Sequence, residues 1–192
     1  AYVAPSLDRY LANLSQQLLR AGDFCLGIDH ISQKGLPGEA FCPTPHALAQ
    51  LAAVGAVLPK APSLEVLRTV NSRIFCGALP GGLPHTRLAT TIEDVTNHML
   101  QRQLDSWQAG WRLKRLFGMA GRGQRVVRDK LDEKDIRWLV NSLSIGGSGG
   151  IWMEPNVHVL HEFALHGMLT VDGELTLGCL VAQRCDKTGA WI

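Results

Sequence analysis

The chain has 192 residues, of which 46% are hydrophobic and 19% are charged, and its formal net charge at pH 7 is +2. This length and composition suit one sizeable domain or two small ones, and the low net charge excludes a polycation that binds nucleic acid over its whole surface. The sequence contains no run of about 18 apolar residues that could cross a membrane, and its first ten residues lack the pattern of a signal peptide. We therefore expect a cytoplasmic protein without a membrane partner.

The cysteines and one cluster of histidines are the first candidates for metal or redox chemistry. No two of the five cysteines have CxxC spacing, which favours reduced thiols over a disulfide framework or a zinc site. In "HVLHEFALH", a strand would place His158 and His166 on one face and His161 on the other. The three imidazoles would then not converge on one ion, and we predict no metal site among them.

The first 62 residues alternate between helical and extended patterns. Pro45 suits the first turn of a helix, and Pro59 and Pro62 mark a joint after that helix. This alternation predicts a small α/β layer over residues 1–62. In chain order, we expect a helix over residues 6–21, a strand over 24–28 and a helix over 44–56.

The remainder of the chain is predicted to contain helices, one hairpin and a meander. Thr91 and Asp94 have capping-box-like spacing at the start of a helix. Turns at Gly167 and at Asp172-Gly173 would divide an antiparallel β-meander. The fold class is therefore mixed α/β (α+β). We expect helices over residues 63–75, 91–107 and 131–143, an irregular Gly- and Pro-rich loop over 77–87, a hairpin over 111–127 and the meander over 158–183.

The predicted hairpin, "WRLKRLFGMAGRGQRVV", combines basic residues with three glycines and has no acidic residue. On a strand, Trp111 and Leu113 would face one side, and Arg112 and Lys114 the other. The pattern of strand, glycine-rich loop and strand differs from a Walker-type phosphate loop. Its bare backbone N–H groups can still approach an anion, and Lys114 adds a charge. The alternative is a mobile surface hairpin with solvated arginines.

Further motifs surround this hairpin in a definite order. "VNSRIF" places Arg73 before the loop "LPHTRLAT", and "WRLKR" places Lys114 on the strand before "GMAGRGQ". A helix then leads to "IWMEPNVHVLHEF", which contains Glu154 and, several positions later, Glu162. The order and spacing of these five elements resemble the ATP-grasp superfamily over most of residues 63–192.

The resemblance implies a site for ATP. Arg73 and Lys114 would contact phosphate, the glycine-rich lid would close over the β- and γ-phosphates, and Glu162 would hold the ribose hydroxyls. Such cations and amides suit a ligand whose charge lies mostly on its triphosphate. The cofactor-binding residues implied in this way are Arg73, Lys114, Gly118, Ala120, Gly121, Gly123, Glu154, Val157 and Glu162.

The adenine ring is assigned to the hinge strand by the same resemblance. Glu154 and the backbone through Val157 would read the edge of the base, and Met153 would be an apolar neighbour of the flat ring. Without the resemblance, Glu154 could simply end a loop and Glu162 could be a solvated strand residue.

The activity implied is that of an ATP-dependent ligase, which activates a carboxylate as an acyl phosphate for attack by an amine or a thiol. Residues 1–62 would be a pre-ATP-grasp-like segment, residues 63–153 the small subdomain with its lid, and residues 154–192 the start of the larger subdomain. ATP and a carboxylate substrate are the expected partners.

The ATP-grasp fold expected here is incomplete. The later Glu/Asn pair that helps to hold Mg²⁺ in the superfamily has no counterpart, so the Mg²⁺ ligands are expected outside this chain and the chain alone is expected to be inactive. The missing initial Met and the strand-like run shortly before Ile192 favour a fragment of a longer protein over a degenerate relative.

Two other functions stay open. A nucleic-acid-binding module would use the basic hairpin, with Trp111 and Phe117 stacking on bases; the local charge and the nearby acidic "LDEKD" make it less favoured. The other of these two functions is that of a structural or regulatory domain without a ligand. Arg115, Arg122 and Arg125 would meet phosphate or an anionic substrate, or would only solvate the lid.

Overall fold

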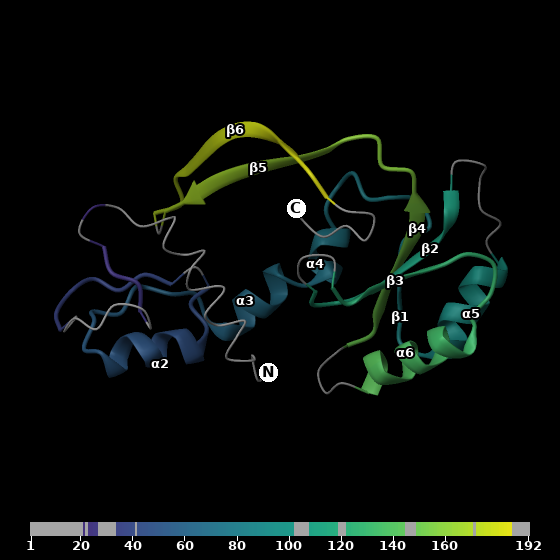
Figure 1. Cartoon of the computed structure of the whole chain (residues 1–192), viewed down its shortest axis with the longest axis horizontal. Helices are drawn as coiled ribbons and strands as arrows, with labels where there is room; N and C mark the ends of the chain where they lie inside the picture. The colour runs from purple at the N-terminus through teal and green to yellow at the C-terminus, as the bar shows by residue number, and fades with distance from the viewer. Residues whose placement is uncertain are drawn as a thin grey trace. The chain divides into compact units, whose positions relative to one another are not determined.

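The computed structural model divides the chain into two compact units, residues 1–64 and residues 65–192 (Figure 1). Residues 6–20 of the expected helix over 6–21, and residues 27 and 28 of the expected strand over 24–28, lie outside the described residues. The structure describes residues 21, 23–26, 34–40, 42–101, 108–118, 122–144, 149–170 and 172–185.

The first unit contains one well-defined helix, α2 (Pro45–Ala53), where a helix over 44–56 is predicted. The Thr44 hydroxyl accepts a hydrogen bond from the backbone N–H of Ala47 at 3.2 Å, and Pro45 occupies the first turn, where its missing N–H costs nothing. The helix ends before Gly55, whose φ of +76° continues the turn in a conformation that favours glycine.

The predicted α/β layer is present in this unit only in outline. Residues 24–26 adopt no strand, contrary to the prediction from "FCLGI". Pro37 and Val57 form an isolated parallel bridge instead, and the N–H of Gly38 donates to the carbonyl of Val57 at 2.8 Å. The apolar run predicted a buried strand, but Phe24 is exposed and only Cys25 beside it is buried.

A single helix over 63–75 is wrong, because two short helices occupy this stretch. The first is α3 (Leu64–Val70) and the second is α4 (Arg73–Gly77). Ser72 separates them: its backbone is extended, at φ −78° and ψ 141°, and its hydroxyl accepts from the N–H of Ile74 at 3.2 Å. A serine in this role begins a new helix and so ends the first one.

Four antiparallel strands form the central sheet of the second unit, in the order β1-β4-β2-β3. The predicted hairpin is confirmed as β2 and β3, with Trp111 opposite Val127 and Lys114 opposite Gln124. β1 was not predicted; it lies at the end of the expected irregular loop and pairs with β4. The strands are β1 (Arg87–Ala89), β2 (Gln108–Arg115), β3 (Gln124–Val127) and β4 (Ile151–Val157).

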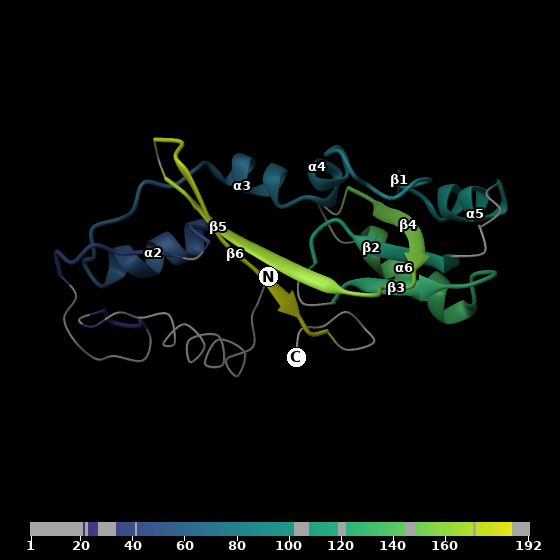
Figure 2. The same cartoon turned by 90° about the horizontal axis from the view of Figure 1, so that it is seen from above.

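Two helices, α5 (Ile92–Gln101) and α6 (Glu133–Ser144), pack on one face of this sheet (Figures 1 and 2). Both were predicted, although residues 102–107 of the longer helix expected over 91–107 lie outside the described residues. The core between helices and sheet is made of Ala89, Val95, Trp111, Leu113, Val127, Leu139, Ile151 and Met153, each at most 2% exposed.

Reciprocal side-chain bonds cap both helices. The Thr91 hydroxyl accepts from the N–H of Asp94 at 3.0 Å, and the Asp94 carboxylate accepts from the N–H of Thr91 at 3.1 Å. At α6, Asp132 and Asp135 exchange the same two bonds at 2.7 and 3.0 Å. The capping-box prediction at Thr91 is therefore confirmed.

The last two strands, β5 (Glu162–Leu169) and β6 (Leu175–Gln183), form a separate antiparallel hairpin (Figure 2). The turn predicted at Gly167 is wrong, since Gly167 lies within β5 at a register shift where β6 carries an extra residue. The turn at Asp172-Gly173 is confirmed, with the N–H of Thr170 donating to the carbonyl of Glu174 at 2.9 Å. One long hairpin thus replaces the expected meander.

The register gives this hairpin two different faces. Cross-strand partners share a face, so one face carries six large apolar side chains and the other carries polar residues such as Glu162, His166 and Gln183. The apolar face is made of Phe163, Leu165, Leu169, Leu175, Leu177 and Leu180, each more than half exposed. Within the described part of the chain, no helix has the length and hydropathy needed to cross a membrane.

Candidate functional site

The face of the central sheet that lies opposite the helices carries several charged and polar side chains beside Trp152. Trp111 and Leu113 of β2 are buried in the core, and Arg112 and Lys114 alternate with them and lie on the other face, as predicted. β4 repeats the pattern, because its residues 151, 153 and 155 are buried and residues 152, 154 and 156 are half-buried. The two strands are neighbours, so their polar side chains lie together.

Lys114 and Glu154 form an ion pair on this face, and each side chain is 17% exposed. Burial lowers the pKa of the Lys114 ammonium, the Glu154 carboxylate raises it, and the nearby guanidinium groups of Arg73 and Arg112 lower it; the net direction is downward. Lys114 is therefore a desolvated cation that one carboxylate stabilises and two other cations oppose.

Arg112 is held rigidly beside this pair by two amide side chains. Its Nε and Nη2 donate to Asn156 Oδ1 at 3.1 and 2.7 Å, and its Nη1 donates to Gln124 Oε1 at 3.1 Å. Asn156 in turn donates to the carbonyl of Ala109 at 3.3 Å. Because both acceptors are neutral, this network orients the guanidinium and leaves its charge in place.

Arg73, at the start of α4, reaches the end of β2 from outside the sheet. Its backbone N–H donates to the carbonyl of Leu116 at 3.2 Å, and its Nε donates to the carbonyl of Arg115 at 3.0 Å. A Cβ at Gly118 would come within 3.4 Å of Arg73 Nη2. The first basic residue of the motif series thus lies at the base of the glycine-rich hairpin.

The resulting cluster carries excess positive charge. Three cations, Arg73, Arg112 and Lys114, stand near one carboxylate, that of Glu154, which leaves two positive charges (three minus one). All four side chains are half-buried. Charges in such a setting are screened less by salt and attract an anion more strongly than solvated ones.

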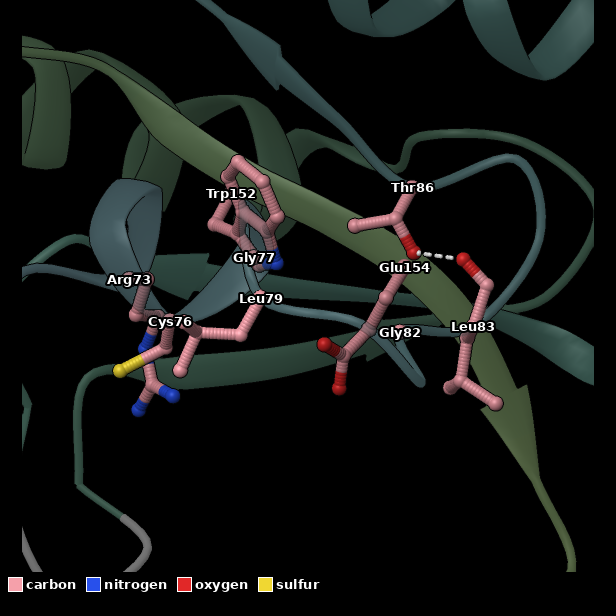
Figure 3. A pocket seen from close by; sticks show the side chains of 9 residues that line it. All are labelled: Arg73, Cys76, Gly77, Leu79, Gly82, Leu83, Thr86, Trp152 and Glu154. Atoms are coloured by element: carbon pink, nitrogen blue, oxygen red, sulfur yellow. Dashed lines mark hydrogen bonds between the residues drawn. The ribbon is translucent and has the colours of Figure 1, made fainter.

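A cavity of about 390 Å³ opens beside the cluster, between α4, the loop of residues 78–86 and β4 (Figure 3). In this loop the Thr86 hydroxyl donates to the carbonyl of Leu83 at 2.6 Å. The lining combines apolar surface with one guanidinium and one carboxylate. It is made of Arg73, Cys76, Gly77, Leu79, Gly82, Leu83, Thr86, Trp152 and Glu154.

Trp152 forms the aromatic wall of this cavity and rests against Gly77. A Cβ at position 77 would overlap atoms Cζ2 and Cη2 of the indole, so only glycine allows this approach. Sequence reasoning missed Trp152 and chose Met153 as the apolar neighbour of a ligand. That choice is wrong, because Met153 is fully buried on the helix side of the sheet. The two-residue alternation from Glu154 would have identified Trp152.

Two arginines of the β2–β3 hairpin point toward α6. Gly123 has φ +73°, and its carbonyl accepts from the N–H of Arg115 at 2.8 Å. Arg115 donates to the buried Ser142 at 2.9 Å, and its guanidinium lies 5.7 Å from the ring centre of Trp138. Arg125 forms an ion pair with the buried Asp135. Arg115 and Arg125 therefore bind α6 and are not the phosphate contacts considered above.

The remaining predicted site residues have different positions. Ala120 and Gly121 lie outside the described residues. Val157 ends β4 opposite Gln108, and Glu162 begins β5 opposite Gln183. Both are half-buried, and neither is among the described residues that line the cavity. Arg73, Gly118, Lys114 and Glu154 are thus brought together, whereas Val157 lies at the end of β4 and Glu162 at the start of β5.

Two alternatives from the sequence can be compared with this geometry. Trp111 is 2% exposed and forms part of the core, so it cannot stack on a base as a nucleic-acid-binding module would require; Phe117 is exposed. Among the described residues, no group of three or more His, Cys, Asp and Glu side chains could hold a metal ion.

No protein-family model and no curated protein matches the chain. Three solved structures of N5-carboxyaminoimidazole ribonucleotide synthetase are similar to it. An ADP complex has 19% identity and a TM-score of 0.45 over 74% of this chain. The enzyme from Thermus thermophilus has 22% and 0.48 over 79%. The Staphylococcus aureus enzyme, complexed with ADP, has 12% and 0.49 over 75%.

These matches cover only 36%, 38% and 37% of the solved chains, so this chain spans little more than a third of their length. The similarity is thus confined to part of the fold of these enzymes. With TM-scores below 0.5, the similarity says nothing about the activity of this chain.

Proposed function

We propose that this chain is the nucleotide-binding part of an ATP-dependent ligase of the ATP-grasp type. The observation that carries the proposal is the convergence of Arg73, Lys114 and Arg112 near a single carboxylate, at the base of a glycine-rich hairpin. A triphosphate would bring to this cluster the negative charge that it lacks. Val157 and Glu162 follow Glu154 along β4 and into β5, and the base and the ribose would bind there.

The chemistry of the cluster suits a polyphosphate. Lys114 supplies a compact ammonium charge, and Arg73 and Arg112 supply planar guanidinium groups whose N–H bonds match phosphate oxygens. Gly118 allows the two arms of the hairpin to approach closely, since a Cβ there would lie 2.8 Å from the carbonyl oxygen of Arg122. These residues bind and orient the phosphates and offset their charge. In the parent ligase, the phosphates would be positioned in this way before a phosphoryl group is transferred to a carboxylate.

Magnesium would have to be held largely by ligands other than the described residues, since these contain no suitable cluster. In a ligase the ion would offset charge that develops on the phosphates. The acid substrate and the attacking amine or thiol are likewise not identified by any contact among the described residues. We therefore assign to the chain only the binding step.

Calorimetric titration of the chain with ATP, with and without Mg²⁺, tests the proposal. We expect saturable binding and a melting temperature that rises with ATP concentration, because a ligand of the native state stabilises by about 2.7 kcal/mol at a hundredfold excess over Kd. Lys114→Met should weaken binding about tenfold or more. Lys130→Met, which removes an exposed lysine, should leave it unchanged.

Two results would count against the proposal. One is the absence of heat and of any melting shift at millimolar ATP. The other is equal affinity of wild-type protein and Lys114→Met. Steeply salt-dependent binding of single-stranded DNA, without ATP binding, would instead favour a nucleic-acid-binding module.

A further inference from the structure

His98 connects the helix side of the second unit to the loop that lines the cavity. It lies in α5, is 4% exposed, and packs edge-on against Trp111 with ring centres 4.8 Å apart and planes at 62°. Its Nε2 lies 2.9 Å from the carbonyl oxygen of His85. Because a carbonyl can only accept, Nε2 must carry the proton and donate this bond.

His85 holds an uncommon backbone conformation at the other end of this bond. Its φ is +60°, and it is the non-glycine residue with positive φ among those that the structure describes. Side chains crowd the backbone in this left-handed region, so a residue stays there only when its surroundings hold it. The hydrogen bond from His98 to the carbonyl of His85 stabilises the backbone in this conformation.

The turn at His85 sets the course of the cavity wall. The loop of residues 78–86 contributes Leu79, Gly82, Leu83 and Thr86 to the lining. Its first part is fixed to α4, where the N–H of Leu79 donates to the carbonyl of Cys76 at 3.2 Å. Its last part passes through His85 into β1. Gly81, with φ +92°, lies between these two ends.

We propose that His98 is a positioning residue for the cavity. Its Nε2–H holds the left-handed turn at His85 and thereby keeps Leu83 and Thr86 against the space that Trp152 and Glu154 border. The imidazole is not among the described groups that line the cavity, and it acts through the loop from the helix side of the unit. The consequence for ligand affinity depends on the proposed function, whereas the consequence for the loop does not.

Hydrogen exchange of the unliganded chain tests the inference directly. In His98→Leu, which keeps an apolar group beside Trp111 but cannot donate, amides of residues 78–86 should exchange about tenfold faster. His98→Gln restores an N–H at a similar distance from the backbone and should recover most of the protection. Adding His85→Gly to His98→Leu should recover part of it, because glycine adopts positive φ without strain.

Val95→Ala is the matched control, since Val95 is a fully buried residue of the same helix that belongs to the core. It should speed exchange across the whole unit and not selectively in the loop. Selective exposure of the loop in His98→Leu, with rescue by His98→Gln, supports the inference. Equal profiles of His98→Leu and Val95→Ala overturn it, and so does a His98→Gln variant that behaves like His98→Leu.

ATP titration of the same variants then separates this inference from the proposed function. If the loop adopts the observed conformation in only a fraction of the molecules, the apparent affinity for ATP falls in proportion to that fraction. His98→Leu should therefore bind ATP about five- to tenfold more weakly. Wild-type protein that does not bind ATP refutes the proposed function and leaves the exchange result to decide on His98. Loop opening in His98→Leu with unchanged ATP affinity overturns the link between His98 and the cavity.

Discussion

Lys114 and Glu154 form an ion pair across β2 and β4, although neither faces the other directly in the strand register. Lys114 is opposite Trp152, and Glu154 is opposite Arg112. The pair is therefore diagonal, and it places the carboxylate among three cations. An incoming phosphate must share Lys114 with a carboxylate that is already bound to it.

Replacing Glu154 by Gln should strengthen the binding of inorganic tripolyphosphate. The substitution removes the competing charge and raises the excess positive charge of the cluster by one. It also removes the carboxylate that raises the pKa of the Lys114 ammonium, so that pKa should fall further. We expect affinity to rise roughly three- to tenfold at low salt, and less at high salt.

Isothermal titration at two salt concentrations measures this effect. Glu133→Gln makes the same charge change at an exposed residue in the first turn of α6 and should have no such effect. Weaker tripolyphosphate binding by Glu154→Gln would show that the carboxylate supports the anion site instead of competing with it.

Gly77→Ala should destabilise the second unit, because its methyl group would overlap the indole of Trp152. Overpacking of this kind costs about 1–3 kcal/mol in free energy of unfolding. Gly82→Ala is the matched control, since a Cβ there meets nothing closer than 3.9 Å. Urea unfolding measures both. Combining Gly77→Ala with Trp152→Leu should remove most of the cost, and simple additivity of the two losses would contradict the clash.

Arg125→Ala should lower stability and leave ATP affinity unchanged. Arg125 neutralises Asp135, which is 7% exposed, and removal of the guanidinium leaves a buried carboxylate without its cation. We expect a loss of about 1–3 kcal/mol in urea unfolding. Arg122→Ala, at an exposed position of the lid, should change stability little. If Arg125→Ala strongly weakened ATP binding while the free energy of unfolding stayed unchanged, Arg125 would belong to the proposed phosphate site after all.

Asp94→Asn should make unfolding less sensitive to acid. Backbone and hydroxyl hydrogen bonds from Thr90, followed by those from Thr91, hold the pKa of Asp94 below its ordinary value of 3.8. A carboxyl whose pKa is depressed by folding stabilises the protein above its ordinary pKa, and this contribution is lost as pH falls through the folded value. Wild-type protein should therefore exceed Asp94→Asn in urea midpoint at neutral pH, and the gap should close below about pH 4. A gap that persists in acid would contradict this.

Local rules predicted the parts of the fold that depend on neighbouring residues. Alternation along β2 separated Trp111 from Lys114, and the capping box at Thr91 marked the start of α5. The same alternation, extended to Arg115, would have placed its side chain on the helix side with Leu113, where it bonds Ser142. The phosphate contact was suggested by the positive charge of Arg115 alone, without regard to the face of the strand on which its position lies.

The errors arise where a local signal has two meanings. Ser72 is acceptable within a helix and also begins one, so "SLEVLRTVNSRIF" could be read as one helix or two. Gly167 can mark a turn or an irregularity within a strand, and its register shift in β5 depends on the partner strand. Gly77 contacts Trp152, which lies far along the chain, and His98 bonds to His85 in the preceding loop. Neither contact could be predicted from the periodicity of the sequence.

The meeting of Gly77 with Trp152 also constrains how this protein can vary. A related chain that keeps a bulky ring at position 152 has to keep glycine at position 77, and only a chain that first loses the ring can accept a larger residue there. The ring at position 152 must therefore be lost before Gly77 is replaced, and the two positions should vary together in descendants of a common ancestor.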